Sequence, residues 1–249
     1  MSTQALRDKI AVITGGSSGI GAACARAMAA EGSRVVVGYH QGLDRAQALV
    51  AELPGQGHAA RHIPLDDTAS HRALAEWIRQ ELGRADILIN SAGYTRRIPH
   101  ADLAQMEPAL FNEILLANAG GTFSITRALL PLLQERGDGL VVNISSVSAF
   151  TGSGSNIAYC AAKAAVDTLT MSLARVFGPK VRFLSVSPAS VDTDFVSGRS
   201  REELAKKAAQ TPLGRVVTPE DVARAVLACA THLKTATGTR IVIDGGHTL

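Results

Sequence analysis

Residues 9–21 read Lys9-Ile10-Ala11-Val12-Ile13-Thr14-Gly15-Gly16-Ser17-Ser18-Gly19-Ile20-Gly21, and this stretch decides the fold. Its first six residues form a short, mostly apolar run that ends at glycines, which predicts a buried β-strand. The glycine turn leads directly into an alanine-rich segment up to Gly32, which predicts a helix. A strand that passes through a tight turn into a helix is the repeating unit of α/β folds.

The glycine turn has the spacing G-x-x-x-G-x-G, which differs from the G-x-G-x-x-G pattern of many dinucleotide-binding turns. Its physical uses are similar: a tight turn, close approach of the backbone to a diphosphate at a helix N-terminus, and close packing of helix on strand. A glycine-rich turn without a ligand is the alternative interpretation. The candidate cofactor contacts in this turn are Gly15, Ser17, Ser18, Gly19, Ile20 and Gly21.

Apolar runs and helical patterns alternate along the rest of the chain. Further strands are expected at residues 33–38, 58–65, 85–90, 140–144, 181–187 and 240–243. Helices are expected at residues 44–53, 68–82, 101–110, 111–136, 159–177, 200–209 and 219–232. This alternation predicts a single doubly wound α/β domain over residues 1–249, with a seven-stranded parallel sheet and helices on both faces. Ligands of such a sheet bind outside the carboxyl ends of its strands.

A tyrosine, a lysine and a serine follow the fifth expected strand. Tyr159 and Lys163 are four residues apart, which puts both on one helix face. A nearby ammonium favours the phenolate and is therefore expected to lower the pKa of Tyr159. Ser146 stands at the carboxyl end of the strand, where its hydroxyl and the phenol could meet one substrate oxygen. These residues predict a proton-transfer site for a carbonyl or an alcohol, although a Tyr and a Lys at this spacing also occur by chance.

Two further motifs contain small residues. The fourth strand ends in Asn90-Ser91-Ala92-Gly93, where small side chains let a flat ring or a ribose lie against the backbone; a plain turn is the alternative. Asn118 is followed by Gly120 and Gly121 inside a long helical pattern. Glycines at that place are costly and predict a kink, for close helix packing or for function.

The composition argues against several classes of partner. The chain carries a net charge of only +3 with acids and bases interleaved, so we expect no nucleic-acid partner. No apolar run approaches the roughly 18 residues that span a bilayer, and residues 1–9 are polar, so we expect no membrane partner and a cytoplasmic location. Cys24, Cys160 and Cys229 lie far apart without metal-ligand spacing, so we expect reduced cysteines and no metal site.

In this order and spacing, the motifs resemble the short-chain dehydrogenase/reductase family over essentially the whole chain. The closest resemblance is to the branch with 3-oxoacyl-acyl-carrier-protein reductases and many sugar, polyol and steroid dehydrogenases. Further matching pieces are Pro188…Thr193, Pro212-Leu-Gly-Arg215, Pro219-Glu-Asp221 and Asp244-Gly-Gly246. Two departures are Ser91, where the family usually has Asn, and Ala189, where Gly usually follows the proline.

The resemblance implies a Rossmann-type fold and an NAD(P)-dependent oxidoreductase that interconverts a secondary alcohol and a ketone. It implies that Tyr159 is the general acid/base and that Ser146 orients the substrate oxygen. Lys163 would bind the nicotinamide ribose and lower the pKa of Tyr159. Asn118 would hold a water that carries the proton to solvent.

The resemblance also implies cofactor contacts. Val191 and Thr193 match positions that hold the nicotinamide carboxamide, and Asp66 matches a position that meets the adenine. The expected contacts outside the glycine turn are Tyr39, His40, Asp66, Asn90, Ser91, Ala92, Gly93, Tyr159, Lys163, Pro188, Val191 and Thr193.

The end of the second strand bears on cofactor choice. An acidic residue there would bind the ribose hydroxyls of NAD, but Tyr39 stands in that place, and His40 and Arg45 could offer positive charge to a 2′-phosphate. NADP is therefore expected. NAD stays possible because Ser17-Ser18 lacks the basic residue of many NADP-dependent members.

A non-catalytic NAD(P)-binding scaffold or sensor is the alternative of another class, since fold alone does not decide function. A scaffold has no need of Asn118, Ser146, Tyr159 and Lys163 together. The loop at residues 194–212 is expected to cover a small-molecule substrate whose identity the sequence leaves open. A 3-oxoacyl-acyl-carrier-protein substrate stays an alternative, disfavoured because residues 134–138 offer no clean basic surface beside the cleft.

The long helical pattern carries more apolar positions than one buried stripe needs. One set is Phe111, Leu115, Ala119, Phe123 and Thr126, and a second set is Leu116, Thr122, Leu129 and Leu133. A stripe that does not face the sheet usually marks an interface. We therefore expect a homotetramer, or failing that a dimer.

Overall fold

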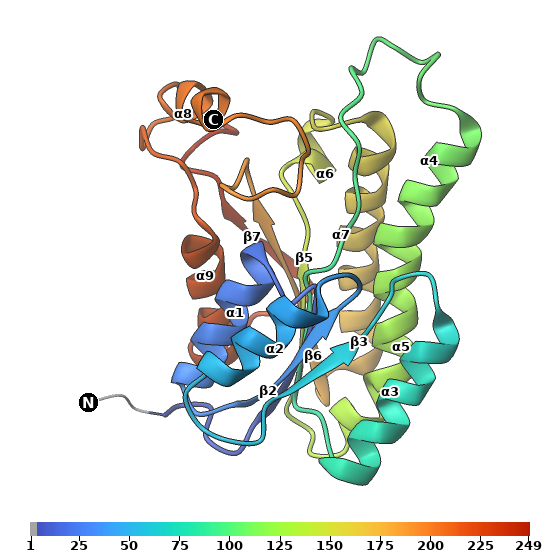
Figure 1. Ribbon diagram of the computed structural model, residues 1–249, viewed down its shortest axis with the longest axis vertical. Coiled ribbons are helices and arrows are strands. Elements are labelled where there is room, and N and C mark those ends of the chain that lie inside the picture. Colours follow the sequence, from blue (N-terminus) through green and yellow to red (C-terminus); the bar gives the residue numbers. More distant parts are fainter. Residues whose placement is uncertain (1–3) are drawn as a thin grey trace.

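The computed structural model describes residues 4–249, and a seven-stranded parallel sheet forms its centre. The strand order is β3-β2-β1-β4-β5-β6-β7 (Figure 1). The strands are β1 (Ile10–Thr14), β2 (Arg34–Tyr39), β3 (Ala59–His62), β4 (Ile87–Asn90), β5 (Gly139–Ile144), β6 (Val181–Pro188) and β7 (Thr239–Ile243). All seven predicted strands are present, and the predicted doubly wound α/β fold is confirmed.

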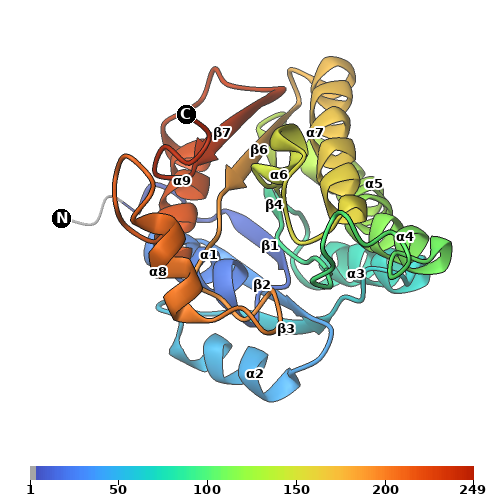
Figure 2. The same cartoon turned by 90° about the horizontal axis from the view of Figure 1, so that it is seen from above.

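Helices cover both faces of the sheet (Figure 2). One layer contains α1 (Gly19–Ala30), α2 (Leu43–Glu52) and α9 (Pro219–Thr231). The other contains α3 (Thr68–Glu81), α4 (Pro108–Leu115), α5 (Gly121–Gln134) and α7 (Ile157–Phe177). Two short helices, α6 (Ser148–Thr151) and α8 (Arg201–Ala208), lie at the carboxyl edge of the sheet. Because both faces are covered, β1, β4 and β5 consist only of buried residues.

The prediction of a helix at residues 101–110 is wrong for most of that range. Turns occupy residues 101–107, and the helix begins at Pro108 and continues through α5. Proline fits the first helical turn because the N–H it lacks would have no partner there. The short helix α6 was not expected, and α7 begins at Ile157 because the Asn156 side chain accepts the Tyr159 N–H at 2.7 Å.

The expected kink in the long helix takes the form of a π-helical turn, η1 (Leu116–Gly120), between α4 and α5. Gly121 follows it directly. A Cβ on Gly121 would lie 2.8 Å from the Leu65 carbonyl oxygen, so only glycine permits this approach. Gly120 has no such contact, since a Cβ there would stand 3.7 Å from the Leu116 side chain. Close packing therefore accounts for Gly121.

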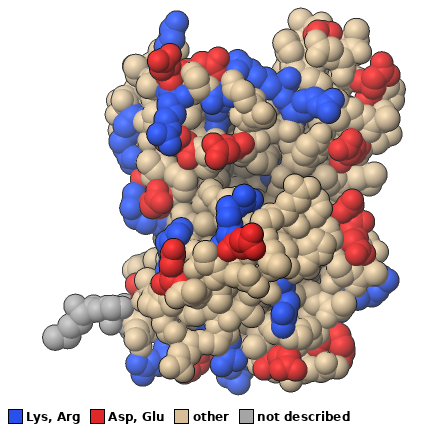
Figure 3. Space-filling model, viewed as in Figure 1, with Lys and Arg blue, Asp and Glu red and all other residues tan. Residues whose placement is uncertain are grey.

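The surface mixes charges. Lys and Arg side chains are interspersed with Asp and Glu over the face in Figure 3, and a hollow opens in its upper half. Within residues 4–249 no helix is both long and apolar enough to cross a membrane. All three cysteines are free and buried.

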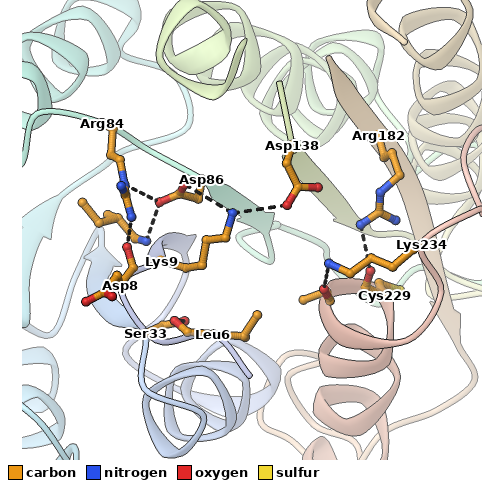
Figure 4. A network of polar contacts seen from close by, with 12 residues as sticks. Leu6, Asp8, Lys9, Ser33, Arg84, Asp86, Asp138, Arg182, Cys229 and Lys234 are labelled. Atoms are coloured by element: carbon orange, nitrogen blue, oxygen red, sulfur yellow. Dashed lines mark hydrogen bonds and ion pairs between the residues drawn. The ribbon is translucent and has the colours of Figure 1, made fainter. Parts of the chain in front are cut away.

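A buried carboxylate organises the amino ends of the central strands (Figure 4). Asp86 accepts the Ile10 N–H at 2.8 Å, which fixes the start of β1. Arg84 pairs with the same carboxylate at 3.0 Å and Lys9 at 3.7 Å. Lys9 also pairs with Asp138 at 3.2 Å, at the start of β5. One carboxylate therefore ties together the amino ends of β1, β4 and β5.

Removing that carboxylate should destabilise the fold. Asp86→Ala leaves the Arg84 guanidinium and the Ile10 N–H without this carboxylate and leaves Lys9 with Asp138 alone, so we expect a loss of about 3 kcal/mol in the free energy of unfolding. Urea denaturation followed by circular dichroism measures it. Asp138→Ala is the matched control: its side chain is 54% exposed, so its pair with Lys9 should contribute less than about 1 kcal/mol. Equal losses in the two variants would contradict the organising role of Asp86.

Candidate functional site

The sequence-predicted site residues gather at the carboxyl edge of the sheet. The glycine turn follows β1, the segment Ser91–Gly93 follows β4, and Ser146 comes just after β5. Tyr159 and Lys163 lie on the first turns of α7, beside the carboxyl end of β5. Tyr39 ends β2 and Pro188 ends β6, with Val191 and Thr193 in the loop that follows. Strand order thus brings together residues that are far apart in sequence.

Ser146, Tyr159 and Lys163 form one group. The Ser146 hydroxyl lies close enough to the Tyr159 phenol to act against the rise in its pKa, and lies 3.1 Å from the Ser148 hydroxyl oxygen. The Lys163 Nζ lies 5.6 Å from the centre of the Tyr159 ring. It donates to the Ile144 carbonyl oxygen at 2.8 Å, which anchors α7 to the end of β5. A substrate oxygen that meets the phenol would therefore meet the Ser146 hydroxyl too.

Burial dominates the electrostatics of this group. Desolvation raises the pKa of Tyr159, while the Ser146 hydroxyl and the charge of Arg199 lower it. Desolvation lowers the pKa of Lys163 to about 8, and Asp167 raises it. The expected net lowering of the Tyr159 pKa is therefore wrong. Burial destabilises the phenolate more than Ser146 and Arg199 stabilise it.

The Asn118 side chain is fully buried and bonded to backbone. Its Nδ2 donates to the carbonyl oxygens of Ile114 at 2.8 Å and Tyr94 at 2.7 Å, and its Oδ1 accepts the Tyr94 N–H at 3.3 Å. A Cβ on Gly93 would lie 2.9 Å from this Oδ1, which requires glycine there. Both amide hydrogens are committed, so a relay water would have to bind an oxygen of Asn118. That role stays a prediction.

A series of buried side-chain hydrogen bonds links the strands beneath the site. The Asn90 Nδ2 donates to Asn143 Oδ1 at 2.8 Å and to Thr126 Oγ1 at 3.1 Å. Asn143 Nδ2 donates to Thr170 Oγ1 at 2.8 Å, and the Thr170 hydroxyl lies 2.9 Å from that of Ser185. The Asn90 side chain therefore links strands instead of reaching the cleft. Asn90, Asn143 and Ser185 are polar residues in mostly apolar strands, and that pattern is the sequence signal for these hydrogen bonds.

The N-terminus of α1 fits an anionic diphosphate. Ser18 caps the helix without a side-chain hydrogen bond, and the first turn carries no acidic residue. The first backbone N–H groups are therefore available, and the helix dipole favours negative charge there. Thr193 lies against this end, because a Cβ on Gly19 would stand 3.2 Å from its methyl group.

The segment after β4 lies against the glycine turn. The Thr14 hydroxyl accepts the N–H groups of Ser91 and Ala92, each at 3.1 Å. A Cβ on Gly15 would lie 2.8 Å from the Ala92 Cα, so glycine lets the two segments touch. This close approach leaves a smooth backbone surface, which suits a flat ring or a ribose.

The ends of β2 and β3 form a ring cluster. Tyr39 pairs in register with His62, and their ring centres lie 5.5 Å apart. The His40 ring lies 5.9 Å from that of His62. Asp66 is exposed in the turn after β3. Sequence reasoning named Tyr39, His40 and Asp66 but missed His62, which strand register alone brings to Tyr39.

The segment after β6 lies over the cleft near Tyr159. Val191 is buried and bridges to Val217, and its carbonyl oxygen accepts Arg199 Nη2 at 2.6 Å. The ring of Phe195 lies 5.9 Å from that of Tyr159. Arg97 binds Glu203 of α8 at 3.1 Å across the cleft. Sequence analysis placed residues 194–212 here but did not single out Arg199 or Phe195.

The segment at residues 134–138 does not border the cleft. Asp138 pairs with Lys9 at the amino ends of the strands, at the opposite edge of the sheet (Figure 4). The argument that this segment disfavours an acyl-carrier-protein substrate is therefore wrong, because the charge of that segment cannot act on a partner at the cleft.

Comparison with known proteins identifies the family of this chain. A family model described as "Enoyl-(Acyl carrier protein) reductase" matches residues 15–248. The chain is 38% identical over 248 residues to "Granaticin polyketide synthase putative ketoacyl reductase 2" of Streptomyces violaceoruber, covering 99% of this chain and 98% of that protein. It is 32% identical over 249 residues to cis-4-hydroxycyclohexanecarboxylate dehydrogenase of Sinomonas cyclohexanicum, covering 98% of each.

A solved structure has the same fold. The crystal structure of "a putative short-chain dehydrogenase/reductase" from Burkholderia xenovorans superposes with a TM-score of 0.91 at 33% identity. The match covers 96% of this chain and 98% of that one. Sequence and fold agree over almost the full length, and the chain belongs to the short-chain dehydrogenase/reductase family.

Proposed function

We propose that Tyr159 is the general acid/base of this oxidoreductase, which acts on alcohol and carbonyl groups with a nicotinamide cofactor. The observation that carries the proposal is the grouping of Ser146, Tyr159 and Lys163 at the carboxyl edge of the sheet. A non-catalytic scaffold would have no use for this group beside a diphosphate site.

The residues divide the work. When bound, the nicotinamide supplies or accepts the hydride. Ser146 holds the substrate oxygen by a hydrogen bond, and the Tyr159 phenol gives that oxygen a proton during reduction or takes it during oxidation. Lys163, fixed by Ile144, binds the nicotinamide ribose and offsets charge on the phenolate. Asn118 holds the Tyr94 backbone in place and binds the relay water through an oxygen.

The substrate is a small carbonyl or alcohol compound under this proposal. Residues 1–249 act as one domain, and residues 194–212 cover the substrate. Support comes from Phe195, whose ring lies 5.9 Å from that of Tyr159. Relatives are named for substrates as different as a ketoacyl group and a hydroxycyclohexanecarboxylate, so the names do not choose among substrates. The cytoplasmic location stays a prediction.

NADP is the proposed cofactor. The position that would carry an acid in an NAD-specific enzyme holds Tyr39. The His62 ring lies beside that of Tyr39, and the His40 ring lies beside that of His62. None of these three side chains carries a negative charge, so a 2′-phosphate meets no charge repulsion from them. The glycine turn itself adds no basic residue.

A homotetramer is the proposed assembly. The two predicted apolar sets each divide: Leu129 and Leu133 are buried under the sheet, whereas Leu116 is 67% and Phe123 45% exposed. Val176 on α7 is 70% exposed. Exposed apolar side chains on the α4–α5 and α7 helices support a two-fold helix interface, and closed symmetry would repeat it.

Tyr159→Phe should lower turnover by about 10² or more, because the ring stays and the proton is lost. The dissociation constant of the cofactor, measured by its fluorescence, should change little. Tyr94→Phe is the matched control: it also removes a phenol, but Tyr94 bonds to Asn118 through its backbone, so this variant should keep most of the activity. Substantial turnover in Tyr159→Phe would sink the assignment.

Tyr39→Asp should move cofactor preference from NADP toward NAD by about tenfold or more, because a carboxylate there repels a 2′-phosphate. The ratio of kcat/KM for the two cofactors measures it. Gln41→Asp adds the same charge two residues away and should change the ratio far less. A parent enzyme that prefers NAD tenfold would refute the proposed cofactor.

Light scattering at micromolar concentration should give the mass of four chains of 26.0 kDa. The double change Leu116→Glu and Phe123→Glu places charge on the proposed interface and should reduce that mass. Leu43→Glu, on α2 and 44% exposed, is the control and should leave it unchanged. A parent mass near that of one chain would refute the interface.

A further inference from the structure

Arg199 is a half-buried cation beside the proposed reaction centre. It lies in the loop between β6 and α8, and only one of its three guanidinium nitrogens has a hydrogen-bond partner within residues 4–249. Nη2 donates to the Val191 carbonyl oxygen at 2.6 Å. Nε is shielded from solvent and unpartnered. The guanidinium is thus held in place by one bond while its remaining donors lack acceptors.

The nearby acids act on Arg199 only at a distance, without a direct ion pair among the described residues. Asp192 pairs with Arg201 at 3.7 Å, and Glu203 pairs with Arg97 at 3.1 Å. No carboxylate in the described part of the chain comes within 4 Å of Arg199. A cation that has lost part of its hydration without gaining an ion pair is costly, so a bound anion would relieve that cost.

Arg61 shows the contrast. Its Nε is also buried without a partner, but its guanidinium lies 3.7 Å from the centre of the Trp77 ring. That aromatic face compensates part of the lost hydration. No aromatic ring among residues 4–249 stacks on Arg199 in this way. Burial of an arginine alone does not indicate a ligand site. Arg199 differs from Arg61 because neither a paired carboxylate nor an aromatic ring among the described residues compensates for its lost hydration.

Arg199 also interacts with the reacting group. Burial lowers the pKa of Arg199, whereas the charges of Asp192, then Tyr159 and Glu203, raise it. Burial raises the pKa of the Tyr159 phenol, and the charge of Arg199 acts against that rise. The two groups are therefore close enough to interact electrostatically. Phe195, four residues earlier on the same loop, lies with its ring 5.9 Å from that of Tyr159. The loop thus presents an apolar ring and a cation to one small volume.

We propose that Arg199 binds a carboxylate of the substrate, so that the enzyme selects oxo acids over neutral ketones. The planar fork of an arginine matches the two oxygens of a carboxylate. Its free N–H groups hold the anion while Phe195 packs on the carbon chain, and the carbonyl reaches Ser146 and Tyr159. This inference rests on the proposed role of Tyr159.

The test uses matched pairs of probes: 4-oxopentanoate, 5-oxohexanoate and 4-oxocyclohexanecarboxylate, each beside its methyl ester. The parent enzyme should have the higher kcat/KM for the acid in at least one pair. Arg199→Gln should lower kcat/KM for that acid about 10- to 100-fold and change the value for its ester less than about threefold. Arg199→Lys should restore part of the preference. Arg201→Gln, whose side chain is 89% exposed on the same segment, should leave the ratio unchanged.

Each contrary result has a definite meaning. A parent enzyme that prefers no acid over its ester overturns the proposal. Equal losses for acid and ester in Arg199→Gln show that Arg199 only holds the loop through Val191, which also overturns it. A rise in the KM of the cofactor without a change in the acid-to-ester ratio assigns the anion to the cofactor diphosphate and overturns it as well. Tyr159→Phe tests the proposed function separately, because it should lower turnover of acids and esters alike.

Discussion

A parallel sheet covered on both faces leaves only its edges for chemistry, and the arrangement of this molecule follows from that constraint. Strands β1, β4 and β5 are wholly buried, so side chains along them serve packing or internal hydrogen bonds. The Asn90 and Asn143 amides bond to each other at 2.8 Å and on to threonines of α5 and α7. These bonds hold the carboxyl ends of the central strands at fixed spacing. The loops that follow these strands therefore also begin at fixed positions.

The fold opposes charge on both Tyr159 and Lys163. Burial favours the neutral forms of both Tyr159 and Lys163, because it raises the pKa of the phenol and lowers that of the amine. The charge of Asp167 acts in the opposite direction on the pKa of Lys163. The lysine pKa of about 8 lies near neutral pH, so small changes in its surroundings change its charge.

The sequence was informative where chemistry is local. The seven strands, the glycine turn and the spacing of Tyr159 and Lys163 were recognisable because periodicity and spacing express short-range geometry. Burial depends on the whole fold, so the net direction of the Tyr159 pKa could not be derived from a neighbour four residues away. The meetings of Tyr39 with His62 and of Tyr159 with Arg199 depend on strand register and loop path. The error about residues 134–138 was avoidable, because a helix that returns antiparallel to the strands must end at their amino edge.

The contact between Arg97 and Glu203 has a consequence for turnover. It joins the segment before α4 to α8 and so spans the cleft, but both side chains are about half exposed. Solvent-exposed ion pairs contribute little and weaken as salt rises. The Arg97–Glu203 pair can therefore open at little cost and does not hold the two sides firmly together. The rigid edge of the sheet fixes where the reacting groups lie, and this exposed ion pair leaves the entrance free for ligand exchange.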